Sequence, residues 1–209
     1  MEKIEQPNFL RVIEEISKAI HEKKEYLTEL DAAIGDGDHG INMARGFAAV
    51  QSKLDQMVNQ DIGTILKSVG MTLVSEIGGA SGPLYGTAFI EAGKSAQGKT
   101  EVDHKDLIAM GEAALAGIKK RGRSERGQKT MIDAIEPALN AFRVANSIFE
   151  GLREAVEASR KGMEETIQMI AKKGRASYLG PRSIGHQDPG ATSSALMFDI
   201  AYKTLKGES

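Results

Sequence analysis

The sequence predicts an all-α fold, a single domain over residues 1–209 in which eight helices run up and down. Three observations predict it. Apolar residues recur at three- and four-residue spacing through most of the chain, which is typical of helices that bury one face. No segment shows the alternation of a half-buried strand or the rhythm of strand–helix–strand units. No linker divides the chain, and most connections are short enough for consecutive helices to run antiparallel.

The first four helices follow from apolar periodicity and from residues suited to helix starts. Asp61 can cap the third helix, because its carboxylate can accept free N–H groups of a first turn. The fourth is expected to begin at Ser81 or Pro83, since proline is favourable in a first turn. The expected ranges are, in chain order, about 7–26, 39–57, 61–77 and 81–95.

The last four helices are recognised in the same way. The fifth ends in three cationic residues, 119–121, followed by Gly122, which suits the carbonyl end of a helix. Thr130 opens the sixth, in which Pro137 is a candidate kink. The apolar stripes predict helices over about 107–118, 130–145, 149–171 and 191–205.

Composition excludes several classes of protein. The formal net charge of −2 gives no general attraction to nucleic acid or to an anionic membrane. The chain has no cysteine, which excludes disulfides and thiolate chemistry and fits a reducing cytoplasm, the expected location. No apolar run approaches the ~18 residues of a membrane span, and the N-terminus does not resemble a signal peptide.

Residues 30–42 concentrate the chemically active side chains. They include three aspartates, Asp31, Asp36 and Asp38, between two predicted helices. Carboxylates close together raise one another's pKa, so such a cluster favours a bound cation. Hard oxygen donors in a chain without cysteine indicate Mg²⁺ or Ca²⁺ rather than zinc. The alternative is a polar turn in which Asp38 caps the next helix, a role that needs one aspartate and not three.

Four loops rich in glycine and polar residues are predicted to converge. In an up-and-down bundle alternate loops share one end, and these four lie between helices one and two, three and four, five and six, and seven and eight. We therefore expect one composite site at that end. The loops are residues 31–42, 78–86, 122–131 and 174–190.

The loop before Ser81 is suited to a phosphate, because free N–H groups and the positive end of a helix would face it. The alternative is a helix-start turn with Ser81 as cap. Asp188 has the same two readings, a helix start or a functional residue. Five cationic residues in the third and fourth loops would balance polyphosphate charge. These are Arg123, Arg126, Lys129, Arg175 and Arg182.

A second candidate for phosphate binding is the segment GKSAQGKT, residues 93–100, which matches the P-loop pattern. A P-loop needs a buried strand before it and a helix beginning at Lys99 and Thr100, whereas the sequence predicts the end of a helix there. We expect this segment at the opposite end of the bundle. A P-loop NTPase would lose nucleotide binding with Lys99→Ala, whereas a site at the aspartates would lose it with Asp36→Asn.

Three stretches, DAAIGDGDHGINM (31–43), GASGPLYG (79–86) and SYLGPRSIGHQDPG (177–190), together resemble the nucleotide-binding L subunit of dihydroxyacetone kinases. The resemblance extends over nearly the whole chain. It implies an antiparallel barrel of eight helices that binds ADP or ATP with two Mg²⁺ ions, held by Asp31, Asp36 and Asp38. Met131 would lie against adenine, a place that suits an adaptable apolar side chain. The implied nucleotide contacts are His39, Gly40, Ile41, Asn42, Ala80, Ser81, Gly122, Met131, Arg175, Asp188, Pro189 and Gly190.

The resemblance also implies an activity and partners. In the subunit form of these kinases, the L subunit keeps its nucleotide as a coenzyme. It takes a phosphoryl group from a phosphohistidine on the M subunit, a phosphotransferase-system partner, and passes it to dihydroxyacetone on the K subunit. No catalytic residue is implied beyond the metal–nucleotide site. The alternative is a non-catalytic, nucleotide-dependent partner of a transcription regulator, and a homodimer is compatible with either.

Overall fold

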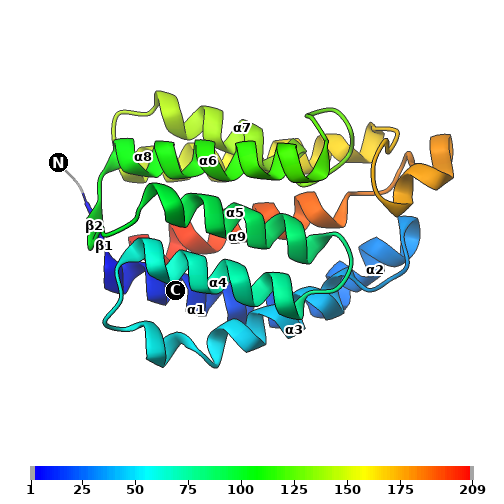
Figure 1. The fold of residues 1–209 in the computed structure, drawn as a ribbon. Coiled ribbons are helices and arrows are strands. Elements are labelled where there is room, and N and C mark those ends of the chain that lie inside the picture. Colours follow the sequence, from blue (N-terminus) through cyan, green and yellow to red (C-terminus); the bar gives the residue numbers. More distant parts are fainter. Residues whose placement is uncertain (1–2, 208–209) are drawn as a thin grey trace.

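The computed structural model describes residues 3–207, and within that range the chain is almost entirely helical (Figure 1), as the sequence predicted. Nine α-helices lie in the described part. They are α1 (Gln6–Glu22), α2 (Lys24–Ile34), α3 (His39–Gln51), α4 (Ile62–Glu76), α5 (Ser81–Ser95), α6 (His104–Gly122), α7 (Ile132–Val144), α8 (Ile148–Glu165) and α9 (Pro189–Lys206).

The ninth helix arises because the predicted first helix is divided in two. Lys23 leaves helical geometry, with φ of −94° and ψ of 10°, and α2 begins at the next residue. The prediction of a loop from Asp31 was wrong at its start, because α2 continues to Ile34 and carries Asp31 in its last turn. Leu27 and Ile34, seven residues apart, are both buried, which extends the helical face beyond the predicted end.

Shorter elements refine two further predictions. The predicted helix over 39–57 is α3 followed by a separate 3₁₀ turn, and the one over 149–171 ends as α8 before another. No strand was expected, yet two strands of two residues pair antiparallel, a length at which alternation cannot be detected. These elements are η1 (Leu54–Met57), η2 (Thr166–Gln168), η3 (Arg175–Ser183), β1 (Ile4–Glu5) and β2 (Glu101–Val102).

Consecutive helices pack side by side, with α4 against α5, α5 against α6, α7 against α8 and α8 against α9. The last helix also packs against α1, which closes the bundle (Figure 1). The α4–α5 pair is especially close: a Cβ on Gly70 would lie 2.6 Å from the carbonyl oxygen of Gly86. Glycine at these positions therefore sets the separation of the two helices.

The two ends of the bundle differ in character. The connections from α2 to α3, α4 to α5 and α6 to α7 lie at the same end as η3, and β1 and β2 lie at the other (Figure 1). Residues 93–100 form the last turn of α5 and its connection to β2, so the strand and helix that a P-loop requires are missing there. The P-loop interpretation is therefore wrong. No helix in residues 3–207 is long and apolar enough to cross a membrane.

Candidate functional site

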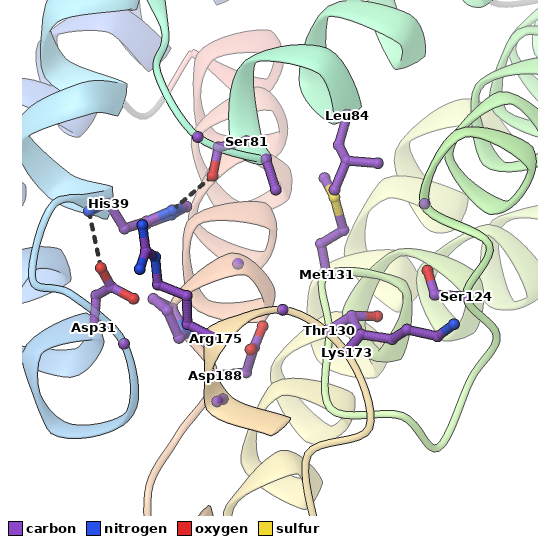
Figure 2. Close-up of a pocket in the computed structure, with 18 of the residues that line it drawn as sticks. Asp31, His39, Ser81, Leu84, Ser124, Thr130, Met131, Lys173, Arg175 and Asp188 are labelled. Atoms are coloured by element: carbon purple, nitrogen blue, oxygen red, sulfur yellow. Dashed lines mark hydrogen bonds between the residues drawn. The ribbon is translucent and has the colours of Figure 1, made fainter. Parts of the chain in front are cut away.

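All four predicted loops line one cavity of about 460 Å³ at this end of the bundle (Figure 2). The predicted convergence of the four loops at one end of the bundle is therefore confirmed. Twelve of the fifteen predicted metal and nucleotide residues border the cavity: Asp31, Asp36, Asp38, His39, Ala80, Ser81, Gly122, Met131, Arg175, Asp188, Pro189 and Gly190.

The other three predicted residues, Gly40, Ile41 and Asn42, lie in the first turn of α3 outside the cavity lining. Gly40 packs so closely on α2 that a Cβ there would lie 2.0 Å from the carbonyl oxygen of Lys24. The Asn42 side chain is buried and accepts a hydrogen bond from Arg45 Nη2 at 2.8 Å. In this structure the three residues shape the start of α3, and their contact with a nucleotide stays a prediction.

Asp31, Asp36 and Asp38 form the acidic wall of the cavity, with one carboxylate oxygen from each within 4.8 Å of the others. Asp31 Oδ2 accepts the backbone N–H groups of Asp38 (2.9 Å) and His39 (3.2 Å), so it caps α3 from the preceding helix (Figure 2). Asp38, in the cap position, makes no side-chain cap hydrogen bond. The capping interpretation of Asp38 is therefore wrong, and its carboxylate is available to a cation.

The donor set fits Mg²⁺. Three carboxylates supply only hard oxygen atoms, and their spacing lets one ion contact more than one of them. Arg175 reaches this wall from η3, with its Nε 2.8 Å from Asp36 Oδ2. The guanidinium group thus places one positive charge beside the acidic wall. Three carboxylates so close together are expected to favour a cation there.

Ser81 and His39 form the wall where α5 begins. His39 Nδ1 lies 3.0 Å from Ser81 Oγ, and His39 Nε2 lies 2.9 Å from Ser193 Oγ (Figure 2). Burial lowers the pKa of His39 to about 4, so the imidazole is neutral near pH 7. Gly79, with φ of +68°, turns the chain into α5, and no side chain caps that helix. Because Ala80 and Ser81 line the cavity, the uncapped N–H groups of the first turn are suited to bind an anion there.

The opposite wall is apolar. Met131 is 4% exposed and lies beside Leu84 (Figure 2), and the buried Ile118 also lines the cavity. The cavity is consequently divided into a charged part at the aspartates and an apolar part at Met131. A ligand with a polyanionic end and a flat apolar end matches both parts.

Asp188 lies at the bottom of the cavity, where α9 begins. Its Oδ2 accepts the N–H of Ala191 at 2.7 Å, so the helix-start interpretation is confirmed. Burial raises the pKa of Asp188 to about 7. The carboxyl group both caps α9 and faces the cavity, so the two readings of this residue are compatible.

Lys129 was expected to face phosphate, and this was wrong. Its ammonium group is buried and donates to carbonyl oxygens of Thr166 (2.7 Å), Ser183 (2.8 Å), Met169 (3.3 Å) and His186. Burial lowers its pKa. Lys129 therefore joins the third loop to both ends of the segment that carries Arg175.

The other cationic residues of these loops are also placed away from the proposed phosphate position. Arg126 pairs with Glu165 at 3.6 Å, and Arg123 and Arg182 do not border the cavity. Of the five cationic residues, Arg175 is the one that extends to the acidic wall.

Sequence reasoning missed several lining residues. They include Leu84, Ser124, Thr130 and Lys173, which Figure 2 shows around the apolar part of the cavity. Leu84, Ser124 and Thr130 lie inside the predicted loops and Lys173 directly precedes one, but no residue type or spacing marks them as ligands.

The fold and the cavity define a class: an all-α bundle whose loops at one end form a site for an anionic ligand and a divalent cation. The model of the DAK2 domain matches residues 33–203 of this chain. The chain therefore belongs to the DAK2 domain family, and the resemblance found in the sequence is confirmed.

The chain is 47% identical to the PEP-dependent dihydroxyacetone kinase 1, ADP-binding subunit DhaL of Listeria innocua serovar 6a, over 93% of this chain and 94% of that subunit. It is also 47% identical to the corresponding Escherichia coli K12 subunit, over 85% of this chain and 87% of that one. The dihydroxyacetone kinase of C. freundii, solved in complex with AMP-PNP and Mg²⁺, has a TM-score of 0.74 and 27% identity. That match covers 98% of this chain and 35% of that kinase.

Proposed function

We propose that this chain is the ADP-binding subunit of a PEP-dependent dihydroxyacetone kinase and carries a phosphoryl group on a nucleotide bound with two Mg²⁺ ions. The observation that carries the proposal is the meeting of the acidic wall, the free start of α5 and Arg175 in one cavity with an apolar far wall. Similarity to ADP-binding subunits and to a kinase solved with AMP-PNP and Mg²⁺ supports it.

Each wall has a role in phosphoryl transfer, which depends mainly on positioning and charge neutralisation. Asp31, Asp36 and Asp38 would hold the Mg²⁺ ions, which supply charge neutralisation of the phosphates when bound. The N–H groups at Ser81 would receive a phosphate, and Arg175 would add a charged donor. His39 is neutral and holds the Ser81 hydroxyl, so it positions the loop without being phosphorylated.

The apolar wall would receive the base. Met131 and Leu84 offer a slot for adenine, which exposes two flat apolar faces. Asp188 to Gly190 would contact the nucleotide at the start of α9. No general base is needed from this chain, because the acceptor hydroxyl belongs to a triose held elsewhere.

The proposed partners supply what this chain does not: the acceptor triose and the phosphoryl group. A K subunit would present dihydroxyacetone, and a phosphohistidine on an M subunit would recharge the nucleotide. The naming of the relatives as subunits supports such an assembly. We further propose that residues 1–209 act as one domain in the cytoplasm, in agreement with the absence of cysteine.

The test is reconstitution. The purified chain with its bound ADP, mixed with K subunit and a large excess of phosphorylated M subunit, should convert dihydroxyacetone over many turnovers without added ATP, and Asp36→Asn should stop this. ADP bound without any turnover in that mixture would leave only the non-catalytic role of a nucleotide-dependent partner of a transcription regulator. Absence of ADP binding would contradict both.

A further inference from the structure

The acidic wall makes one ion pair within residues 3–207, and its partner comes from η3. Arg175 Nε lies 2.8 Å from Asp36 Oδ2, whereas Asp31 is occupied with the N–H groups that start α3. The guanidinium group therefore meets the carboxylate that the proposed function assigns to a divalent cation. Asp36 cannot pair equally well with the Arg175 guanidinium group and with a divalent cation, because two cationic groups at one carboxylate repel each other.

Arg175 is placed so that it can leave Asp36. Its side chain is 68% exposed, and that of Asp36 is 37% exposed, so the pair is held weakly. Arg175 follows Gly174, whose φ is +62°, and Gly180 interrupts η3 with φ of +53° and ψ of −128°. These two glycines allow the tip of the segment, residues 174–180, to change its path.

The base of the same segment is fixed. The Lys129 ammonium group binds carbonyl groups at Thr166 and Met169 on one side and at Ser183 and His186 on the other. The N–H of Gly185 also donates to the carbonyl oxygen of Ile167 at 2.7 Å. A movement of Arg175 would thus be confined to the tip, which lines one side of the cavity, and would leave the acidic wall and the start of α5 in place.

The alternative partner for Arg175 lies in the same cavity. Figure 2 shows its side chain extending toward His39, on the side where Ser81 and the free start of α5 lie. A phosphate bound at that helix start would offer a guanidinium group two oxygen atoms in a planar arrangement, which is stronger than an exposed pair with one carboxylate oxygen.

We infer that Arg175 is a positioning residue that stands in for a divalent cation at Asp36 and moves to the nucleotide phosphate when that cation binds. This rests on the proposed function and deepens it, because it makes the occupation of Asp36 by Mg²⁺ and the engagement of phosphate by Arg175 one linked event. Without nucleotide, Arg175 partly neutralises the acidic wall. Mg²⁺ added alone must therefore displace Arg175 from Asp36 in order to bind.

The test is calorimetry on the full chain, with Arg175→Gln as the variant and Arg182→Gln as the matched control. Arg182 lies on the same segment, is exposed and makes no ion pair within residues 3–207. Without nucleotide, Arg175→Gln should bind Mg²⁺ about three- to tenfold more tightly than the wild type, because a competing charge has been removed. At saturating Mg²⁺ the same variant should bind ADP about tenfold more weakly.

The two opposite effects separate this role from damage to the fold, which would weaken both ligands. Equal or weaker Mg²⁺ binding by nucleotide-free Arg175→Gln, with Mg²⁺-dependent ADP binding intact in the wild type, would overturn the inference and leave the proposed function standing. Failure of the wild type to bind ADP with Mg²⁺ would overturn both. Arg182→Gln should match the wild type in each titration, and a shift equal to that of Arg175→Gln would show a general charge effect and contradict the specific pairing.

Limited trypsin digestion gives a second readout on the wild type. The segment contains Lys172, Lys173, Arg175 and Arg182 as cleavage sites. Mg²⁺ alone should accelerate cleavage after Arg175, because its side chain leaves Asp36, and ADP with Mg²⁺ should slow it below the ligand-free rate. Unchanged cleavage with Mg²⁺ alone, at a concentration that calorimetry shows to be saturating, would contradict the release of Arg175.

Discussion

Asp188 illustrates how much the surroundings of a single residue matter in this protein. Its carboxyl group is buried at the start of α9, and burial raises its pKa to about 7, whereas an unfolded chain would ionise it near 3.8. The folded protein therefore holds a proton that unfolding releases. Stability from this group is complete below about pH 4 and is lost as pH rises to about 7.

The free energy of unfolding of Asp188→Asn should consequently depend on pH differently from that of the wild type. Relative to the variant, the wild type should lose on the order of 4 kcal/mol between pH 4 and pH 7.5. His39, whose pKa is lowered to about 4, changes stability in the opposite direction but is common to both proteins. Urea denaturation of both without Mg²⁺ or nucleotide measures the difference, and parallel pH profiles would show that Asp188 is ionised throughout.

Some residues of the site could be predicted from the sequence and others could not. Asp31, Asp36, Asp38 and Ser81 lie in compact motifs, so their types and spacing indicated their place in the cavity. Lys129 could not be assigned, because a lysine in a polar loop normally points into solvent. Its four carbonyl partners lie 37 to 57 residues away in sequence. Only the folded chain shows that it is a buried structural group.

At the scale of elements, the loop fixed by Lys129 links the two sides of the cavity. Lys129→Met keeps an unbranched apolar stem one atom shorter than that of lysine but leaves the buried carbonyl groups without their donor. We expect a loss of about 2 kcal/mol in the free energy of unfolding and faster proteolysis between residues 166 and 186. Chemical denaturation and mapped proteolysis measure both, with Lys172→Met, at an exposed position, as control. Wild-type stability in Lys129→Met would mean that water replaces the ammonium group without cost.

The α4–α5 pair offers a test of packing between elements. A Cβ on Gly70 would lie 2.6 Å from the carbonyl oxygen of Gly86 and 2.9 Å from the backbone N of Ile90, so the helices must separate to admit it. Gly70→Ala should cost about 1–3 kcal/mol, despite the better helix propensity of alanine. Met71→Ala, on the same helix and 60% exposed in the wild type, should change stability little. Equal melting temperatures for the two variants would show that α5 moves away freely.

The predicted elements agree with the structure where capping and periodicity act together. The start of α4 at Asp61 and the extent of α5 from Ser81 to Ser95 were both predicted. The break at Lys23 was not, because lysine is compatible with a helix and no glycine or proline marks the position. The separation of α1 from α2 depends on how each helix packs in three dimensions, which local sequence does not record.

For the whole molecule, the rule that alternate loops share one end was enough to predict a composite site. Exposed apolar side chains lie at both ends of the bundle. Tyr178, on η3 beside the cavity, is 87% exposed, and Val144, at the end of α7 away from it, is 80% exposed. We expect the partner that presents the acceptor to cover Tyr178, because transfer requires close approach at the cavity.

Tyr178→Ala should therefore lower turnover in the reconstituted system about tenfold through a raised KM for the K subunit, since tyrosines at interface centres often contribute more than 1 kcal/mol. Its ADP affinity should be unchanged. Val144→Ala is the matched control at the other end and should behave as the wild type. A similar loss in both variants, or in neither, would argue against a partner surface at the cavity.

We propose that the nucleotide binds at the acidic wall and not at the segment resembling a P-loop. Titration of ADP in the presence of Mg²⁺ into the wild type, Asp36→Asn and Lys99→Ala tests it most directly. Asp36→Asn should weaken ADP binding about 30-fold or more, which corresponds to the loss of one charged contact of about 2 kcal/mol. Lys99→Ala should remain within about twofold of the wild type, because Lys99 pairs with Asp106 at the other end of the bundle. Loss of ADP binding in Lys99→Ala, with normal binding in Asp36→Asn, would place the nucleotide at the segment resembling a P-loop instead.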